Sequence, residues 1–394
     1  MTSRHRRRRG TSPAAPRSPL EDKDLLMEIL LRLPRDPSSL PRASAVRKQW
    51  GRLAADPKFV GRFRAHHGKP PLLGVFELGH EIRFRSVLDP PDRIPLERLS
   101  LGRYSNPRHT KVLGCRHGRV LVKDWVRDEV VVCDPITSKQ HRVPILPKFN
   151  ERYPCLNGAV LCAAGGQGHV HGGCHSCPFK VVLVSELDHR PIACVYCSET
   201  GIWGDIISTE ATNTIFDMSP SPSTLVGNVL YWSSTYGRDN ILQFDLDSQN
   251  LEVIRGPRCM NNRFIDHFQI IQAEDGVVGL IVLSCHNLQM WKRKLDSKGV
   301  AIWLRQKTVA LRNILELPPK IRKSRELHGK FVGHDEDNNA VFLYIDGNVY
   351  MVQLKSMLSK KLKGIGSASY CYPFTSFYPP STAITAEYGA KMLG

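Results

Sequence analysis

The stretch "VVVCDPITSKQHRVP", residues 130–144, combines a strand, a turn and a second strand. Its first four residues are apolar and mostly β-branched, which favours a strand packed in a core. Asp134, Pro135, Thr137 and Ser138 follow, and residues of these types favour a tight turn. The chain then returns through "KQHRVP". The stretch therefore predicts a β-hairpin.

The same unit recurs along the chain. Successive turns lie about 50–60 residues apart, which is roughly the length of a blade in kelch-like propellers. A further blade is indicated near residues 72–100, so about six blades would account for residues 70–380. An irregular pair of β-sandwiches is the alternative. The other copies are "ACVYCSETGIWGDI" (193–206), "LQFDLDSQNLEVI" (242–254), "QMWKRKLDSKGVAIWL" (289–304) and a weaker one, "VYMVQLKSMLSKKL" (349–362).

Helices are predicted before the strands. In "EDKDLLMEILLRLP", residues 21–34, Asp22 or Asp24 is placed to cap a helix, and Pro34 ends it because its ring excludes the preceding turn. A second helix is predicted over "SSLPRASAVRKQWGRL", residues 38–53, as one continuous apolar stripe. The apolar positions are Leu25, Leu26, Ile29, Leu30 and Leu33 in the first helix, and Leu40, Ala43, Val46, Trp50 and Leu53 in the second.

A third short helix begins at Asp56-Pro57, as N-cap and first helical residue, and buries Phe59, Val60 and Phe63. Three short helices make a small core, so this unit is marginal alone. The sequence thus predicts an α+β multidomain protein. A small all-α three-helix unit, residues 20–67, precedes an all-β propeller-like (kelch-like) domain, residues 70–385.

The positive charge is unevenly spread. The chain carries a formal net charge of +18, and residues 1–20 hold six arginines and no acid before Glu21. Residues 1–19 are too polar to fold and are predicted to be a disordered basic arm. The run "RHRRRR" indicates a nuclear import signal or a nucleic-acid arm, with a solvated tail as the alternative. The import residues would be Arg4, Arg6, Arg7, Arg8 and Arg9.

Eleven cysteines, an odd count, are scattered through strand-like segments. No run approaches the roughly 18–20 apolar residues of a membrane helix, and the N-terminus has no apolar signal-peptide core. Reduced thiols in the nucleus or cytoplasm are therefore expected.

One cysteine pattern resembles a zinc ribbon: Cys174 and Cys177, sixteen residues, then Cys194 and Cys197. However, "IACVYC" has the character of a strand, in which Cys194 and Cys197 project to opposite faces. The sequence therefore predicts no bound metal and no cofactor, with zinc at these cysteines as the alternative. Nearby donors are His169, His171 and His175.

No catalytic motif is present. The sequence has no Gly-x-Ser-x-Gly elbow, no Gly-x-x-x-x-Gly-Lys and no His-Glu-x-x-His, so nothing in it predicts an enzyme. Trp203, Trp232, Trp291 and Trp303 lie in strand-like runs, where blade packing is their expected role. Basic segments such as "MWKRKLDSK" lack the interleaved aromatics of single-strand binders and are expected to be solvated.

The helical segment resembles the F-box, the module of cullin-RING ubiquitin ligase adaptors. The residues that carry the resemblance are "DLLMEILLRLP" and "SLPRASAVRKQWGRLAADPKF", within residues 20–63. The rest resembles the propeller-like associated region of large plant F-box families, especially those of grasses. It does so through "FRAHHGKPPLLGVFE", "VLGCRHGRVLV", "SETGIWGDIIS", "FQIIQAEDGVVGL" and "YPFTSFY".

The resemblance implies a non-catalytic substrate receptor. Its partners would be a Skp-type adaptor, through it the cullin and RING subunits, and an unknown protein target; neither a membrane nor nucleic acid is implied. Carried over by position, the adaptor-binding residues would be Leu25, Leu26, Ile29, Leu33, Pro34, Val46, Lys48, Trp50 and Leu53.

Three positions depart from the F-box pattern. The usual Leu-Pro falls on Glu21-Asp22, the usual Cys is Arg47, and Gly51 replaces a common Arg. Glycine costs a helix about 1 kcal/mol relative to alanine.

Two other functional classes remain open. One is a nuclear nucleic-acid-binding protein, suggested by the charge, whose binding would weaken steeply with salt. The other is a propeller enzyme or small-ligand binder, which would require a convergent polar pocket.

Deleting residues 1–19 is expected to shift a tagged protein from the nucleus to the cytosol, because these residues hold the arginine run. Fluorescence imaging of full-length and deleted chains measures the shift. Unchanged localisation would mean that the arm carries no import signal.

Overall fold

Two compact units make up the protein. The computed structural model describes residues 20, 22–149, 156–165, 169–188, 190–209, 222–233, 240–257, 267–284, 286–315, 329–365 and 370–378. A helical unit extends to His66, and a β unit runs from His67 to Tyr378. The predicted arm lies outside the described residues.

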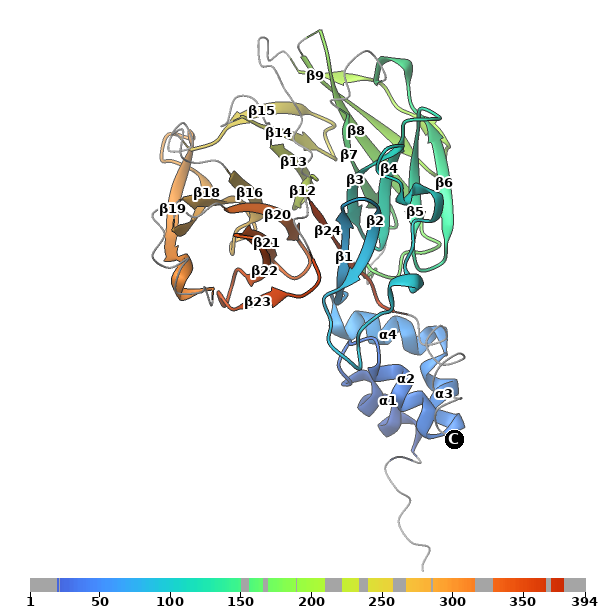
Figure 1. Ribbon diagram of the computed structural model, residues 1–394. Coiled ribbons are helices and arrows are strands. Elements are labelled where there is room, and N and C mark those ends of the chain that lie inside the picture. Colours follow the sequence, from blue (N-terminus) through green and yellow to red (C-terminus); the bar gives the residue numbers. More distant parts are fainter. Residues whose placement is uncertain are drawn as a thin grey trace, which may run out of the picture. The chain divides into compact units, whose positions relative to one another are not determined.

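The helical unit holds four helices among its described residues: α1 (Lys23–Leu31), α2 (Ser39–Val46), α3 (Lys48–Ala54) and α4 (Pro57–His67), shown in Figure 1. Asp22 caps α1, because its carboxylate accepts the N–H groups of Asp24 and Leu25 at 2.9 and 3.1 Å. Asp56 likewise accepts the N–H of Lys58 at 2.8 Å, ahead of Pro57. Both predicted helix starts are confirmed.

The prediction of three helices is wrong, because the second predicted helix breaks at Arg47. This residue is extended, with φ −148° and ψ 144°, and α3 begins directly after it. The break lets α3 fold back on α2, where a Cβ on Gly51 would lie 3.3 Å from the Ser44 carbonyl oxygen. The single apolar stripe is therefore also wrong: Leu40 and Leu53 are buried, whereas Val46 is 61% exposed.

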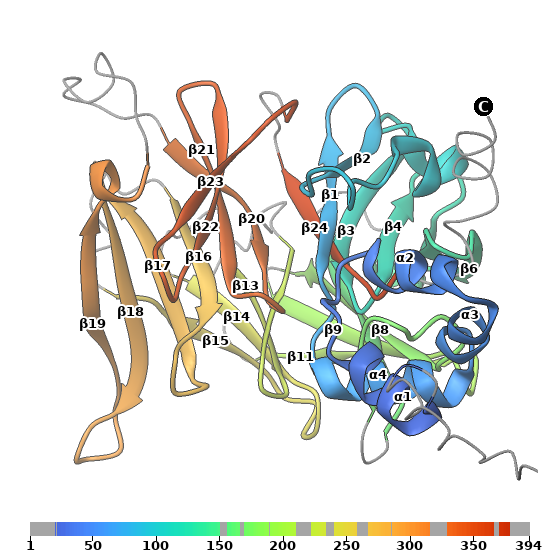
Figure 2. The ribbon, with the colours of Figure 1, turned by 90° about the horizontal axis from the view of Figure 1, so that it is seen from below.

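The β unit is a six-bladed propeller. Over the described ranges its strands form six sheets arranged in a ring (Figures 1 and 2). Blade 1 holds β1 (Leu72–Leu78), β2 (Ile82–Ser86) and β24 (Cys371–Thr375), and blade 2 holds β3 (Thr110–Arg116), β4 (Arg119–Asp124), β5 (Glu129–Asp134) and β6 (Lys139–Pro144). Blade 3 holds β7 (Asn157–Cys162), β8 (Phe179–Leu187), β9 (Arg190–Cys197), β10 (Ile202–Trp203) and β11 (Ile207–Ser208).

The other three blades have four strands each. Blade 4 holds β12 (Thr224–Val226), β13 (Val229–Ser233), β14 (Asn240–Asp245) and β15 (Leu251–Arg255). Blade 5 holds β16 (His267–Gln272), β17 (Val278–Ser284), β18 (Asn287–Leu295) and β19 (Ala301–Ala310). Blade 6 holds β20 (Gly329–Asp335), β21 (Ala340–Ile345), β22 (Asn348–Gln353) and β23 (Ser359–Leu362).

The repeated sequence unit is the outer hairpin of a blade. Each of its five copies joins the third strand to the fourth, from β5–β6 to β22–β23. In three copies an aspartate, Asp134, Asp245 or Asp296, closes the turn by accepting backbone N–H groups. The predicted hairpins and the prediction of about six blades are confirmed.

The ring closes through strands from both ends of the β unit. In blade 1, β24 pairs antiparallel with β1, so residues 371–375 supply the innermost strand of a blade that begins at residue 72. At this seam β24 contacts β20 on one side and β3 on the other. The rings of Phe76, Phe84 and Phe374 pack edge to face there, with centroids 5.6–6.3 Å apart.

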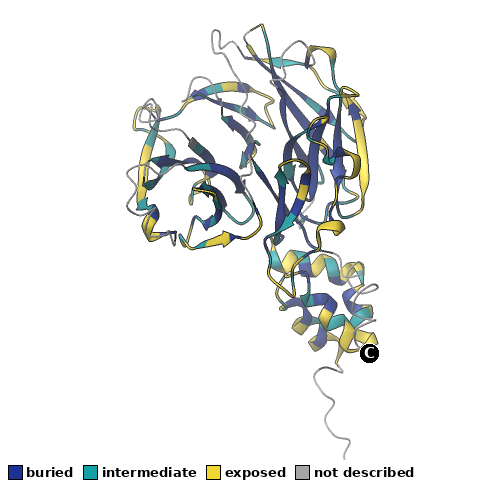
Figure 3. Cartoon of the chain, viewed as in Figure 1, coloured by how far each residue is buried: buried dark blue, intermediate teal, exposed yellow. Residues whose placement is uncertain are grey.

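The hydrophobic core lies between the blades. Among the described residues, six clusters of buried side chains each join two neighbouring blades. Burial decreases from the inner strands to the outer β6 and β19 (Figure 3). Trp232 is fully buried, and the indole N–H groups of Trp203 and Trp303 donate to the preceding blade's Pro144 and Arg255 carbonyls. The predicted packing role of these tryptophans is confirmed.

Gly333→Ala is expected to destabilise the propeller by about 2 kcal/mol or more, because overpacking carries costs of this size. A Cβ there would lie 2.4 Å from the Cys371 carbonyl oxygen, at the seam between β20 and β24. Thermal unfolding of the full chain measures the change. Gly165→Ala is the control, since its Cβ would meet nothing within 4 Å. Equal midpoints for the two variants would contradict the tight seam.

Candidate protein-interaction surfaces

In the described part of the helical unit, three large apolar side chains are exposed. Leu25 is 50% exposed and Ile29 42% exposed, and the two lie four residues apart on one face of α1. Val46, the last residue of α2, is 61% exposed. The inner face of α1 packs in the core of the unit, since Leu26 and Leu30 are buried. The unit thus presents apolar surface that its own core does not need.

The other predicted adaptor-binding residues divide by burial. Pro34 and Lys48 are exposed, whereas Leu33 and Trp50 are half-buried. Leu26 and Leu53 are buried within the unit, which leaves almost no surface of these side chains for a partner. The structure therefore separates binding candidates from core residues, two roles that the sequence pattern merges. The predicted import residues, Arg4 and Arg6 to Arg9, lie outside the described part of the chain.

At the inner edge of the propeller, a buried arginine links three blades. Arg116, at the end of β3, is 8% exposed and pairs with Glu336 at 2.6 Å. Its guanidinium also donates to the hydroxyl and carbonyl oxygens of Ser223, just before β12. Glu336 in turn accepts the N–H of Leu225 at 2.8 Å. Because both charges are satisfied, this network holds the inner edges of blades 2, 4 and 6 together.

Two buried titratable groups, His334 and Asp335, lie beside this network. Burial raises the pKa of Asp335 to about 7, and the nearby Asp337 carboxylate adds to the effect. Burial lowers the pKa of His334 to about 4. Neither ring nitrogen of His334 has a hydrogen-bond partner among the described residues. Both groups therefore favour their neutral forms.

A cavity of about 420 Å³ adjoins this region. Its lining mixes both signs of charge, with Glu274 and Glu336 against Lys69 and Lys355. A larger hollow of about 570 Å³ lies between blades 4 and 5, where Tyr231 meets Lys292 to Lys294. Charged side chains therefore line both hollows.

The cysteines group differently from the predicted zinc ribbon. Cys194 is buried in the core between blades 2 and 3, whereas Cys197 is three residues along the same strand and faces the other way. Cys174 and Cys177 instead lie beside His169 and Cys162, the last residue of β7. A hydrogen bond with Cys174 lowers the pKa of the Cys162 thiol and raises that of Cys174.

The cysteine spacing did not identify Cys162 as a member of this group. A cysteine at the end of the strand that leads into the loop was the available signal. The prediction of no metal rested on Cys194 and Cys197, and that reason does not apply to the four residues that the structure brings together.

A family model described as "F-box protein AT5G49610-like, beta-propeller" matches residues 111–381, more than two thirds of the chain. The chain belongs to this family. An F-box-type protein with a propeller, as expected from the sequence resemblance, is thereby confirmed. The matched residues of this F-box-type propeller begin at β3, so they do not include the four helices.

Solved structures similar to the F-box-type propeller are distant. A functionally unknown protein from Desulfotomaculum acetoxidans DSM 771 is 11% identical, with TM-score 0.38, 78% of this chain covered and 100% of that chain. Dihydro-heme d1 dehydrogenase NirN in complex with DHE is 11% identical, with TM-score 0.32, and the match covers 60% of this chain and 46% of that chain. The Dos1 propeller is 10% identical, with TM-score 0.32, and the match covers 63% of this chain and 58% of that chain. The chain thus spans about half the length of the latter two.

No curated protein matches the chain. In the part of the F-box-type protein that the structure describes, no helix has the length and apolar character needed to cross a bilayer.

Asp335→Asn is expected to become more stable relative to wild type as the pH rises from 4 to 8. In the folded wild type Asp335 keeps its proton up to about pH 7, whereas its ordinary pKa is 3.8. The wild type therefore loses stability across this window, by on the order of 2–4 kcal/mol, and the amide does not. Since both proteins contain His334, its opposite contribution cancels. Unfolding midpoints at several pH values measure the difference.

Asp245→Asn is the control for this measurement. Asp245 makes a similar turn on the surface, and the N–H of Ser248 lowers its pKa. Its wild-type contribution is present above the ordinary pKa of 3.8 and is lost only as pH falls below it, so the Asp245→Asn difference should stay nearly constant from pH 4 to 8. A pH-independent difference for Asp335→Asn would show that this carboxyl ionises normally.

Proposed function

We propose that this chain is the substrate-recruiting subunit of a Skp–cullin–F-box ubiquitin ligase. Membership of an F-box-type propeller family supports a substrate receptor in general. The observation that carries the finer proposal is the exposed apolar surface of the helical unit, formed by Leu25, Ile29 and Val46. These residues occupy positions at which the F-box resemblance places adaptor contacts.

Leu25 and Ile29 form an exposed apolar pair on α1. Two apolar side chains four residues apart on one helix face are the arrangement that a helix inserts into an apolar groove. Polar groups flank them: Glu28 pairs with Arg32 at 2.9 Å and with Arg62 of α4 at 3.4 Å. Exposed ion pairs of this kind add little stability, but they give the apolar pair a polar rim.

In this proposal the chain performs no chemistry and needs no cofactor for the ligase reaction. The helical unit binds the Skp-type adaptor, and the propeller binds the target protein. The benefit is proximity, since holding the target near the charged ubiquitin raises its effective concentration. The arginine run supports residence in the nucleus as well as the cytoplasm, and the grass-type sequence resemblance supports a plant source.

The double variant Leu25→Lys with Ile29→Lys is expected to weaken binding to a Skp-type adaptor by at least about 100-fold. Two charged side chains would replace two apolar contacts that the adaptor buries in the complex. A loss of 1.4 kcal/mol corresponds to a tenfold loss of affinity, so about 1.4 kcal/mol at each position gives 100-fold. Both positions are exposed, so the fold should survive. Titration calorimetry with purified adaptor measures the affinity, and circular dichroism checks the helices.

Leu358→Lys is the matched control, because Leu358 is 71% exposed on the propeller. It should bind the adaptor as the wild type does. If the folded double variant keeps wild-type affinity, this face of α1 does not bind the adaptor. A Trp50→Ala variant would be less decisive, since Trp50 is half-buried and its loss also weakens the unit.

A further inference from the structure

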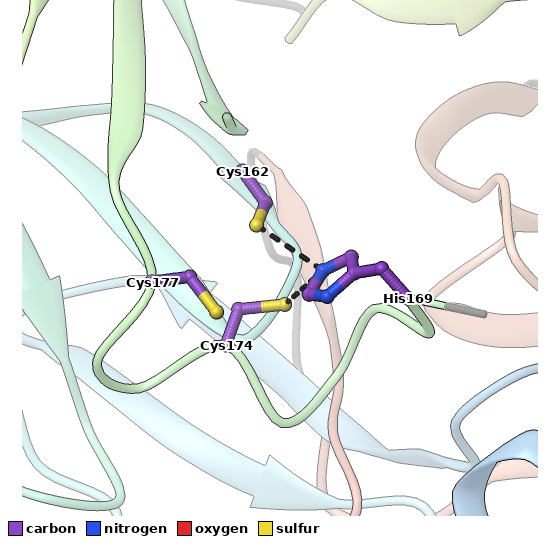
Figure 4. Close-up of side chains that lie close together, drawn as sticks. All are labelled: Cys162, His169, Cys174 and Cys177. Carbon is purple, nitrogen blue, oxygen red and sulfur yellow. Dashed lines mark hydrogen bonds between the residues drawn. The ribbon is translucent and has the colours of Figure 1, made fainter. Parts of the chain in front are cut away.

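Four potential metal ligands meet at one point of blade 3. Cys162 ends β7, and His169, Cys174 and Cys177 lie in the connection from β7 to β8. Their ligand atoms all lie within 4.8 Å of one another. Figure 4 shows the three thiols and the imidazole turned toward a common centre. The Nε2 atom of His169 is 3.4 Å from Cys162 Sγ and 3.5 Å from Cys174 Sγ.

These distances fit a tetrahedral zinc site. Zn–S bonds of about 2.3 Å and Zn–N bonds of about 2.0–2.1 Å place sulfur and nitrogen ligands about 3.6 Å apart, and two sulfurs about 3.8 Å apart. The two observed nitrogen–sulfur distances, 3.4 and 3.5 Å, lie within about 0.2 Å of that value. His169 and two of the thiols therefore already have nearly tetrahedral spacing, and all four ligand atoms lie within 4.8 Å of one another.

The turn that carries two of the thiols is already formed. The N–H of Cys177 donates to the Cys174 carbonyl at 3.1 Å, which closes a tight turn over the Cys-x-x-Cys segment. Arg119 donates to the carbonyl oxygens of both cysteines, at 2.6 Å for Cys177. The backbone of the Cys174–Cys177 turn is thus held in place by the Arg119 side chain of β4.

The charge of Arg119 points to an anionic neighbour. This arginine is 4% exposed, and its Nη1 atom has no hydrogen-bond partner among the described residues. The salt bridges in the described part of the chain do not include it, and its Cζ lies 5.3 Å from the centroid of the Phe179 ring. A buried guanidinium is costly without nearby negative charge. Zinc with three thiolates and one imidazole carries a net charge of −1, which would supply it.

Neighbouring segments hold the loop in place. His117 stacks on His171 with ring centroids 3.7 Å apart, and its Nδ1 accepts the N–H of Cys162 at 3.0 Å. Gly172 accepts hydrogen bonds from Ser376 and Phe377, each at 2.8 Å, in the segment that follows β24. The loop is therefore connected to the strand that closes the ring.

We propose that Cys162, His169, Cys174 and Cys177 bind one structural Zn²⁺. Three thiolates and one imidazole are the ligand types that zinc prefers, and four protein ligands complete its tetrahedron with no position left for water. The ion fixes the β7–β8 loop, and through Gly172 that loop supports the seam at β24. This role is independent of adaptor binding.

The test is the metal content of the full chain, produced in zinc-supplemented cells and purified under reducing conditions without chelator. Elemental analysis should find about one zinc per chain, as a four-ligand structural site requires. Cys162→Ser and Cys177→Ser should each reduce this to below about 0.2 per chain, because serine is a poor zinc ligand. Cobalt added to the metal-free protein should give the visible absorption of tetrahedral cobalt bound to thiolates.

Two controls make the outcome decisive. Cys197→Ser, outside the group, should keep its zinc, and His169→Gln, at a half-buried loop position, should lose it even if the cysteine variants fold poorly. Removing zinc from the wild type should lower its unfolding midpoint and leave adaptor binding unchanged.

Wild-type protein with less than about 0.1 zinc per chain would overturn the proposal. So would a disulfide between any two of the three cysteines in freshly purified protein. Zinc that survives Cys162→Ser and His169→Gln but is lost in Cys197→Ser would mean that other cysteines hold it.

Discussion

The pairing of β24 with β1 is the constraint on which the propeller depends. Hydrogen bonds hold a ring of blades closed when a strand from the C-terminal end completes the first blade, and residues 371–375 do so here. The seam is tight, since the backbone of Gly333 in β20 lies against the Cys371 carbonyl of β24. On its other side the segment after β24 is bound to the β7–β8 loop through Gly172. The proposed zinc would therefore stabilise the same closure that the strand pairing makes.

Much of the fold could be predicted because its signals are local. The turn of an outer hairpin is specified by residues within it. For example, the side chains of Asp134 and Asp245 accept the backbone N–H groups of the residues two and three positions later. Ring closure could not be predicted in the same way, because the sequence of β24, "CYPFT", does not indicate that it pairs with β1, about 300 residues earlier in the chain. The helix break at Arg47 was also missed, since the apolar spacing continues across it and only tertiary packing against Ser44 shows the turn.

The candidate sites show the same division. Sequence resemblance selected nine residues for adaptor binding, but only burial separates Leu25 and Ile29, which are exposed, from Leu26 and Leu53, which are not. For the metal, spacing favoured Cys194 and Cys197, but strand alternation places these two on opposite faces of β9. For Cys174 and Cys177, the sequence spacing then indicated no further metal ligands. Folding supplies them, because β7 delivers Cys162 and the loop returns His169 to the same place.

The two units divide the proposed work: the helices bind the adaptor, and the propeller is left free to bind a target. Hydrogen exchange of the full chain, measured alone and with a Skp-type adaptor, tests this division most directly. The account predicts new protection in residues 22–54, which include α1, α2 and α3, with the amides of the propeller strands unchanged. Protection that appears in the blades, or none in the helices of a formed complex, would contradict it.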